Sequence, residues 1–278
     1  MSTHRNSSSR AVLYYFALAV GLALLLQAVR HDRRAGSGSE TQPPSGRTVA
    51  APPRNPIEQM LLAAPDVESR EGTAVAVLVD VSGSMARPVA GGHGRSQPKI
   101  EIARDSVLRL LRQIDGFVRG HPDRLIHVGI YEFSARGGEP SCRPVVPLGP
   151  PQLTTLETAV RGMVPSGDTP IGDALIHAKQ QLDGSGLTKQ HILVITDGEN
   201  NRGYAPADVV HVLSRLADAR RASVYCIAFD IAADRFRAIR DAGGLVLGAI
   251  NEGELQQTMD YVLTGKILAE QPEVPTAR

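Results

Sequence analysis

The chain has 278 residues, of which 42% are hydrophobic and 21% are charged, so it can bury a core and is neither a fibrous nor a wholly disordered protein. The formal net charge is +1, but residues 1–34 contain five arginines and one aspartate, so residues 35–278 carry a net charge of −3. Because this larger part has no cluster of lysine and arginine, we expect no nucleic-acid partner.

The first predicted element is a membrane anchor. Residues 11–29 form an uncharged run of 19 residues between Arg10 and Arg30, and a helix of that length spans roughly 28 Å, the thickness of a bilayer core. A cleaved signal peptide is the alternative, since Arg5 and Arg10 precede the apolar run. We expect an uncleaved single-pass anchor behind a short basic tail at residues 1–10, with the folded part outside the cytoplasm. That orientation rests on the usual layout of signal anchors, because arginines lie on both sides of the run.

A linker is predicted at residues 30–66. Much of it is rich in glycine, serine and proline and offers little to bury. We expect it to tether a folded domain at residues 67–266, which is followed by a C-terminal tail at residues 267–278.

Within the domain, short apolar runs typical of buried strands alternate with stretches whose apolar residues recur at helical spacing. The predicted strands are residues 73–79, 125–134, 144–148, 191–196, 224–229 and 245–249. The predicted helices are residues 99–118, 154–163, 171–182, 207–222, 234–242 and 254–267. This alternation predicts an α/β fold with a mostly parallel sheet and helices on both faces. Two prolines place the strand at 144–148 at a sheet edge.

Oxygen-bearing side chains follow two of these strands and open one of the helices. They are Asp80, Ser82 and Ser84 after the first strand, Thr169 before the helix that begins at residue 171, and Asp197 after the fourth strand. The carboxyl ends of parallel strands meet at one edge of a sheet, where the binding crevice lies. The three loops therefore converge if the first and fourth strands are neighbours.

Two carboxylates and three hydroxyls provide oxygen ligands only, which suit Mg²⁺, Mn²⁺ or Ca²⁺ and do not suit zinc or copper. Gly83 lets the backbone turn between the two serines. Since the donor set holds two formal negative charges, a bound cation would stay electrophilic and attract a carboxylate from outside. We expect a metal ion that bridges this protein and an acidic partner.

Asp80-x-Ser82-x-Ser84, the Thr169 loop and Asp197-Gly198, in this order on an alternating α/β chain, resemble the metal-ion-dependent adhesion site of a von Willebrand factor type A domain. The resemblance implies that Ser82 and Ser84 bind the ion directly and that Thr169 binds it directly or through water. It implies that Asp80 and Asp197 hold the ion directly or through waters, with Mg²⁺ or Mn²⁺ ahead of Ca²⁺.

The resemblance covers about residues 70–266 and implies a Rossmann-like sheet with one short antiparallel edge strand, for which residues 144–148 are the candidate. It also implies a non-enzymatic domain that binds a protein partner through an acidic side chain of that partner. The resemblance suggests a role in adhesion or assembly, or a function together with a MoxR-type ATPase.

Other interpretations stay open. The sequence Thr169-Pro170 also suits the start of a helix, and the residues from Asp80 to Ser84 also suit an ordinary turn. A metal-activated hydrolase of phosphoesters or esters is one alternative function, although the sequence has no G-x-S-x-G motif and no evident general base. A scaffold with a vestigial metal site is another. The role of the insertion at residues 86–98 does not follow from the sequence.

Overall fold

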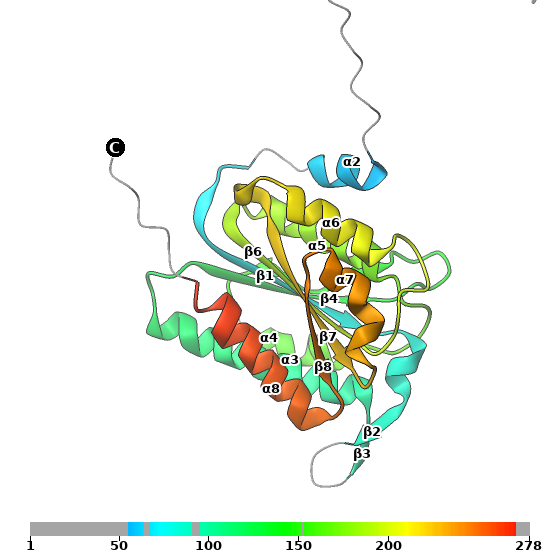
Figure 1. Ribbon diagram of the computed structural model, residues 1–278. Helices are drawn as coiled ribbons and strands as arrows, with labels where there is room; N and C mark the ends of the chain where they lie inside the picture. The colour runs from blue at the N-terminus through cyan, green and yellow to red at the C-terminus, as the bar shows by residue number, and fades with distance from the viewer. Residues whose placement is uncertain (1–54, 64–66, 91–94, 152, 271–278) are drawn as a thin grey trace, which may run out of the picture. The chain divides into compact units, whose positions relative to one another are not determined.

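Six strands form the central sheet of the computed structural model, which describes residues 55–63, 67–90, 95–151 and 153–270 (Figure 1). The strands are β1 (Arg70–Asp80), β4 (Ile126–Phe133), β5 (Cys142–Gly149), β6 (Leu187–Thr196), β7 (Ala222–Phe229) and β8 (Leu245–Ala249). Their order is β5-β4-β1-β6-β7-β8, and β5 pairs antiparallel with β4 while the other neighbours pair in parallel. The predicted mostly parallel sheet and its antiparallel edge strand are confirmed.

Helices cover both faces of this sheet (Figure 1). One face carries α3 (Lys99–Gly120), α4 (Leu153–Arg161) and α8 (Glu252–Val262), and a short π-helix, η5 (Leu263–Ile267), continues α8. The other face carries α2 (Pro56–Leu62), α5 (Ile171–Gly184), α6 (Pro206–Arg215) and α7 (Arg237–Asp241). Short 3-10 turns occur at η1 (Gly83–Ala86), η3 (Asp218–Arg220) and η4 (Ala233–Phe236). A small hairpin, β2 (Pro88–Ala90) and β3 (Ser96–Pro98), precedes α3.

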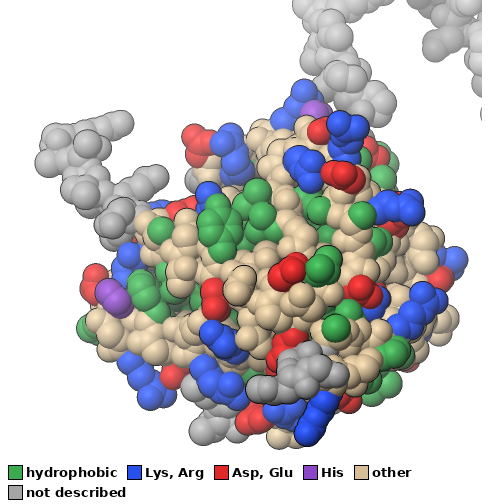
Figure 2. Space-filling model, turned by 60° about the horizontal axis from the view of Figure 1, so that its bottom comes forward, with side chains coloured by type: hydrophobic (Ala, Val, Ile, Leu, Met, Phe, Trp, Pro, Cys, Tyr) green, Lys and Arg blue, Asp and Glu red, His purple; other side chains and the backbone are tan. Residues whose placement is uncertain are grey.

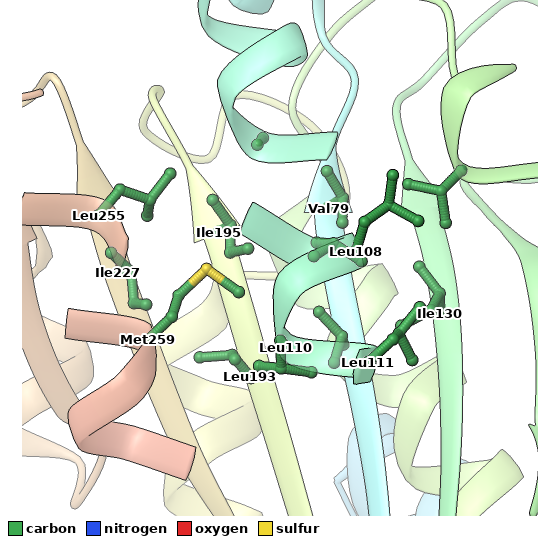
Figure 3. Packing of buried hydrophobic residues seen from close by; sticks show 14 of the residues in the cluster. Val79, Leu108, Leu110, Leu111, Ile130, Leu193, Ile195, Ile227, Leu255 and Met259 are labelled. Carbon is green, nitrogen blue, oxygen red and sulfur yellow. The ribbon is translucent and has the colours of Figure 1, made fainter. Parts of the chain in front are cut away.

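The continuous apolar run of β1 follows from this layering, because successive side chains of a strand point to opposite faces and both faces are covered. Val77 and Val79 pack into the cluster beneath α3 and α8, whereas Ala76 and Leu78 pack into the cluster on the other face. Figure 3 shows the first cluster, where side chains of α3 and α8, among them Met259, meet those of the strands. Full burial of an aliphatic side chain of this size stabilises the fold by about 1.5–3 kcal/mol.

The strand order reverses between β1 and β6. From β1 the chain builds β4 and β5 on one side, and it then crosses to build β6, β7 and β8 on the other. Val79 of β1 pairs with Ile195 of β6 in parallel register, so the first and fourth predicted strands are neighbours. In sheets of this kind a crevice forms beyond the carboxyl ends of the strands at the point of reversal.

One predicted helix is shorter than expected. The apolar spacing predicts a helix over residues 207–222, but α6 ends at Arg215, and Leu216 adopts an extended conformation with ψ 153°. Ala222 already belongs to β7, where it pairs with Gln190. At the end of this segment, the pairing of β7 with β6 therefore overrides the helix that the spacing of apolar residues predicts.

A helix also occurs inside the predicted linker at residues 30–66. In α2, the side chain of Asn55 accepts a hydrogen bond from the backbone N–H of Ile57, and proline occupies the first helical turn. Ile57 and Leu61, four residues apart, are buried on the domain. This apolar pair explains why the end of the segment folds.

The sequence-based prediction of a single-pass membrane localisation is contradicted and is corrected here. Among the described residues, no helix combines the length and the apolar character needed to cross a bilayer. The longest of them, α3, alternates charged and apolar side chains along its length. Residues 11–29, where the membrane helix is predicted, lie outside the described residues.

Candidate metal-binding site

The loop after β1 supplies the first three side chains of the candidate site. Asp80 is completely buried, and its Oδ1 accepts a hydrogen bond of 2.7 Å from the backbone N–H of Ser82. Ser82 is extended and leads into η1, which the buried side chain of Met85 holds in place. As a result, the hydroxyl oxygens of Ser82 and Ser84 lie 3.1 Å apart.

The loop before α5 lies against the loop after β1. The backbone N–H of Gly83 donates to the carbonyl of Gly167 at 3.0 Å, and the N–H of Ser166 donates to the carbonyl of Val81 at 2.7 Å. These two bonds fix the backbone of one loop relative to the other, so the positions of their side chains are coupled.

The loop after β6 joins the other two. The Asn201 side chain accepts a hydrogen bond of 2.7 Å from the N–H of Thr169, and Ser84 Oγ donates one of 2.6 Å to Asp197 Oδ1. A Cβ placed on Gly198 would lie 3.3 Å from Thr169 Oγ1 and 3.8 Å from Ser84 Oγ. The two hydroxyls therefore flank Gly198, and the absence of a side chain at this position leaves room between them.

All five residues predicted from the sequence thus gather at the carboxyl ends of β1 and β6. The alternative in which Thr169 caps a helix is not the observed arrangement. α5 begins at Ile171 after Pro170, and in its first turn the N–H of Gly172 donates a hydrogen bond of 3.3 Å to the side chain of Asn200, not to Thr169.

Burial dominates the electrostatics of Asp80. It raises the pKa of this carboxyl to about 6, although hydrogen bonds from Thr196 and Ser82 act in the opposite direction. Thr196 Oγ1 donates a 2.6 Å hydrogen bond to Asp80 Oδ2. Both oxygens of Asp80 therefore accept hydrogen bonds from the protein. The carboxylate orients Ser82 and places a negative charge at the site.

Lys99 is the main residue that the sequence does not reveal. Its Nζ lies 2.9 Å from Asp197 Oδ2 and 2.7 Å from Asp230 Oδ2, and its side chain is 7% exposed. The sequence marks Lys99 only as the start of a helix. Asp230 follows a strand but belongs to no motif, so no local signal links it to the site.

The donor chemistry fits a hard divalent cation. Hydroxyl and carboxylate oxygens converge within hydrogen-bonding distance of one another, and oxygen donors of this kind suit a hard divalent cation. Throughout the described part of the chain, no group of three or more His, Cys, Asp or Glu side chains could hold a metal ion. The candidate site combines three hydroxyls with two carboxylates and contains no cysteine or histidine.

The face of the molecule seen in Figure 2 carries charges of both signs, interspersed with uncharged side chains. A cavity of about 330 Å³ opens beside Asp168, the residue before Thr169. Arg136, Arg202 and Asp173 also line it. This polar hollow gives space for a group next to the candidate site.

Comparison with protein families gives one match. The model of the von Willebrand factor type A domain matches residues 74–254, which is more than half of the chain. No curated protein sequence matches the chain.

Several solved structures share the fold. The PilB minor pilin from Streptococcus sanguinis is 16% identical with a TM-score of 0.53; the match covers 72% of this chain and 62% of the pilin. The von Willebrand factor domain of the type V pili tip protein Mfa5 from Porphyromonas gingivalis is 11% identical with a TM-score of 0.55, over 74% of this chain and 99% of that one. Proximal thread matrix protein 1 from the mussel byssus, with a zinc-occupied MIDAS motif, is 20% identical with a TM-score of 0.52, over 70% and 48%. Because the sequence identities are this low, these structures show that the chain shares their fold and nothing more.

Proposed function

The chain belongs to the von Willebrand factor type A domain family, and on this premise we propose that the loops beyond β1 and β6 bind Mg²⁺ or Mn²⁺ and, through the ion, an acidic group of a partner protein. The proposed ligand set is the one predicted from the sequence: Asp80, Ser82, Ser84, Thr169 and Asp197.

The hydrogen bond between Ser84 and Asp197 is the observation that carries this proposal. The two residues are 113 positions apart, yet their oxygens lie 2.6 Å from each other, and Ser84 Oγ is also 3.1 Å from Ser82 Oγ. A chain of oxygens from distant loops at one sheet edge is typical of a cation site. A common structural turn would join neighbouring residues only.

Each side chain has a separate task in this proposal. The hydroxyls of Ser82, Ser84 and Thr169 provide neutral oxygen ligands, and Asp197 provides negative charge. Asp80 holds Ser82 through its backbone N–H and adds the second negative charge. The two carboxylates match the formal charge of a divalent cation, but the other three ligands are neutral hydroxyls, so a bound ion would remain a Lewis acid that can accept a partner carboxylate.

A binding role in adhesion or assembly agrees with the position of the site. Arg220, in the turn before β7, donates a hydrogen bond of 2.7 Å to the carbonyl of Leu61, so α2 lies toward the amino ends of the strands. The proposed site lies at the carboxyl ends, where α2 does not obstruct it. Two of the similar structures are a minor pilin and a type V pili tip protein, which are settings of this kind.

Calorimetric titration of the full chain with Mg²⁺ and Mn²⁺ tests the ion. We expect one divalent ion per chain, loss of binding in Ser84→Ala and Asp197→Ala, and unchanged binding in Ser223→Ala, a control at the amino end of β7. Absence of binding by the unaltered chain would support a vestigial site and overturn the proposal.

Affinity capture with the immobilised chain tests the partner. We expect a protein that is retained with Mn²⁺, released by EDTA, and not retained by the Asp197→Ala variant. A partner retained equally in EDTA would show that binding does not proceed through the ion.

A further inference from the structure

Lys99 places a buried positive charge beside the proposed ion site. It is the first residue of α3, and its ammonium group lies between Asp197 Oδ2, at 2.9 Å, and Asp230 Oδ2, at 2.7 Å. The other oxygen of Asp197 accepts the hydrogen bond from Ser84. One carboxylate is therefore shared between an internal cation and the proposed ligand set.

The backbone on both sides fixes this arrangement. The N–H of Lys99 donates to the carbonyl of Arg87 at 3.0 Å, which closes the base of the β2–β3 hairpin. The N–H of Asp230 donates to the carbonyl of Ala249 at 2.7 Å. Among the described residues other than glycine, Asp230 alone has a left-handed backbone, with φ 53°, a conformation that persists when neighbouring contacts enforce it.

The charged groups around the site have opposite effects on a divalent cation. Asp80 and Asp197 attract a divalent cation, whereas the ammonium of Lys99, in contact with Asp197, repels it. In a buried site of low dielectric constant, such repulsion is much stronger than in water. Asp230 counteracts the repulsion because it draws the ammonium toward β7 and adds negative charge nearby.

We propose that Lys99 and Asp230 are positioning residues that set the affinity of the site in opposite directions, Lys99 weakening and Asp230 strengthening its hold on the divalent ion. This inference rests on the proposed function. As a consequence, Asp197 would be shared between Lys99 and the ion, and a carboxylate of the partner would add to the coordination of the ion. A role of Lys99 and Asp230 in stability alone makes a different prediction, since loss of either residue would then weaken ion binding together with the fold.

The test is calorimetric titration of the full chain with Mn²⁺ for the variants Lys99→Met, Lys99→Arg and Asp230→Asn, with thermal unfolding in EDTA to verify folding. We expect Lys99→Met to bind Mn²⁺ on the order of tenfold more tightly and Asp230→Asn on the order of tenfold more weakly. Lys99→Arg, which keeps the charge, should remain within about threefold of the unaltered chain.

Changes of the same sign in Lys99→Met and Asp230→Asn, or no change in either, would overturn the inference. If Lys99→Met does not fold, Asp230→Asn decides, since the Asp230 side chain is 37% exposed. Unchanged or tighter Mn²⁺ binding by this variant would then count against the inference. Failure of the unaltered chain to bind Mn²⁺ would instead overturn the proposed function itself.

Discussion

Thr196 donates a 2.6 Å hydrogen bond from its hydroxyl to Oδ2 of Asp80, 116 residues away in the sequence. The same hydroxyl accepts a hydrogen bond from the N–H of Gly198 at 3.2 Å. Thr196 therefore joins the ends of β1 and β6 and orients both loops that supply the carboxylates of the proposed site.

The Thr196→Val variant tests this link. Valine has a similar volume but cannot donate, so a buried carboxylate loses a partner, which costs about 1–3 kcal/mol. Since the hydrogen bond from Thr196 lowers the pKa of Asp80, its loss raises that pKa further. We expect a lower free energy of unfolding in urea and weaker Mn²⁺ binding, with Thr196→Ser close to the unaltered chain. If the Thr196→Val and Thr196→Ser variants had the same free energy of unfolding and the same Mn²⁺ affinity, the proposed link would be contradicted.

The Asp80→Asn variant should separate stability from ion binding. Burial raises the pKa of Asp80 from 3.8 to about 6, so at pH 7 the folded state carries a carboxylate that it disfavours. In EDTA at pH 7 we expect Asp80→Asn to unfold with a free energy higher by on the order of 1–3 kcal/mol. As the pH falls from about 6 to below 3.8, Asp80 becomes protonated first in the folded state and then in the unfolded state, and the difference should shrink and then vanish. The variant should also lose Mn²⁺ binding.

The matched control for this experiment is Asp234→Asn, because the side chain of Asp234 is 92% exposed. It should leave the free energy of unfolding unchanged over the same pH range. Destabilisation by Asp80→Asn in EDTA at pH 7 would show that the carboxylate is needed for the fold itself.

Ion binding should depend on pH in the same range. A divalent cation requires the carboxylate form of Asp80, and protons compete with the ion once the pH falls below about 6. We expect calorimetry to show an almost constant Mn²⁺ affinity between pH 7 and 8 and about a tenfold loss for each pH unit below the pKa. An affinity that stays constant down to pH 5 would rule out Asp80 as the titrating group.

Gly167 should be indispensable for the position of the Thr169 loop. Its φ is +85°, and an added Cβ would lie 2.3 Å from the carbonyl oxygen of Ala135. We expect Gly167→Ala to lower the free energy of unfolding by about 2 kcal/mol or more and to weaken Mn²⁺ binding.

Gly116→Ala is the control, since a Cβ there meets no atom within 4 Å and the residue lies inside α3. Alanine is the better helix former by about 1 kcal/mol, so this variant should be slightly more stable. Thermal unfolding distinguishes the two outcomes, and a stable Gly167→Ala variant with intact Mn²⁺ binding would contradict the proposed strain.

Local patterns in the sequence were sufficient to predict most of the strands and helices. Continuous apolar runs identify strands covered on both faces, and two prolines identify β5 as an edge strand, because proline cannot donate to a sheet ladder. The polar residues after the first and fourth strands also predict the candidate site, because parallel strands end at one edge of a sheet. That prediction required the two strands to be neighbours, which only the structure decided.

The tertiary structure alone decided the environment of those residues. Lys99 and Asp197 are 98 residues apart, and neither belongs to a motif that includes the other. Their contact depends on the strand order β1-β6-β7 and on where α3 begins after the hairpin. The sequence by itself therefore determined which oxygen-bearing side chains lie at the ends of these strands and loops. Only the folded chain determined the raised pKa of Asp80 and the counter-charge of Asp197, because burial and charge separation depend on neighbours from distant segments.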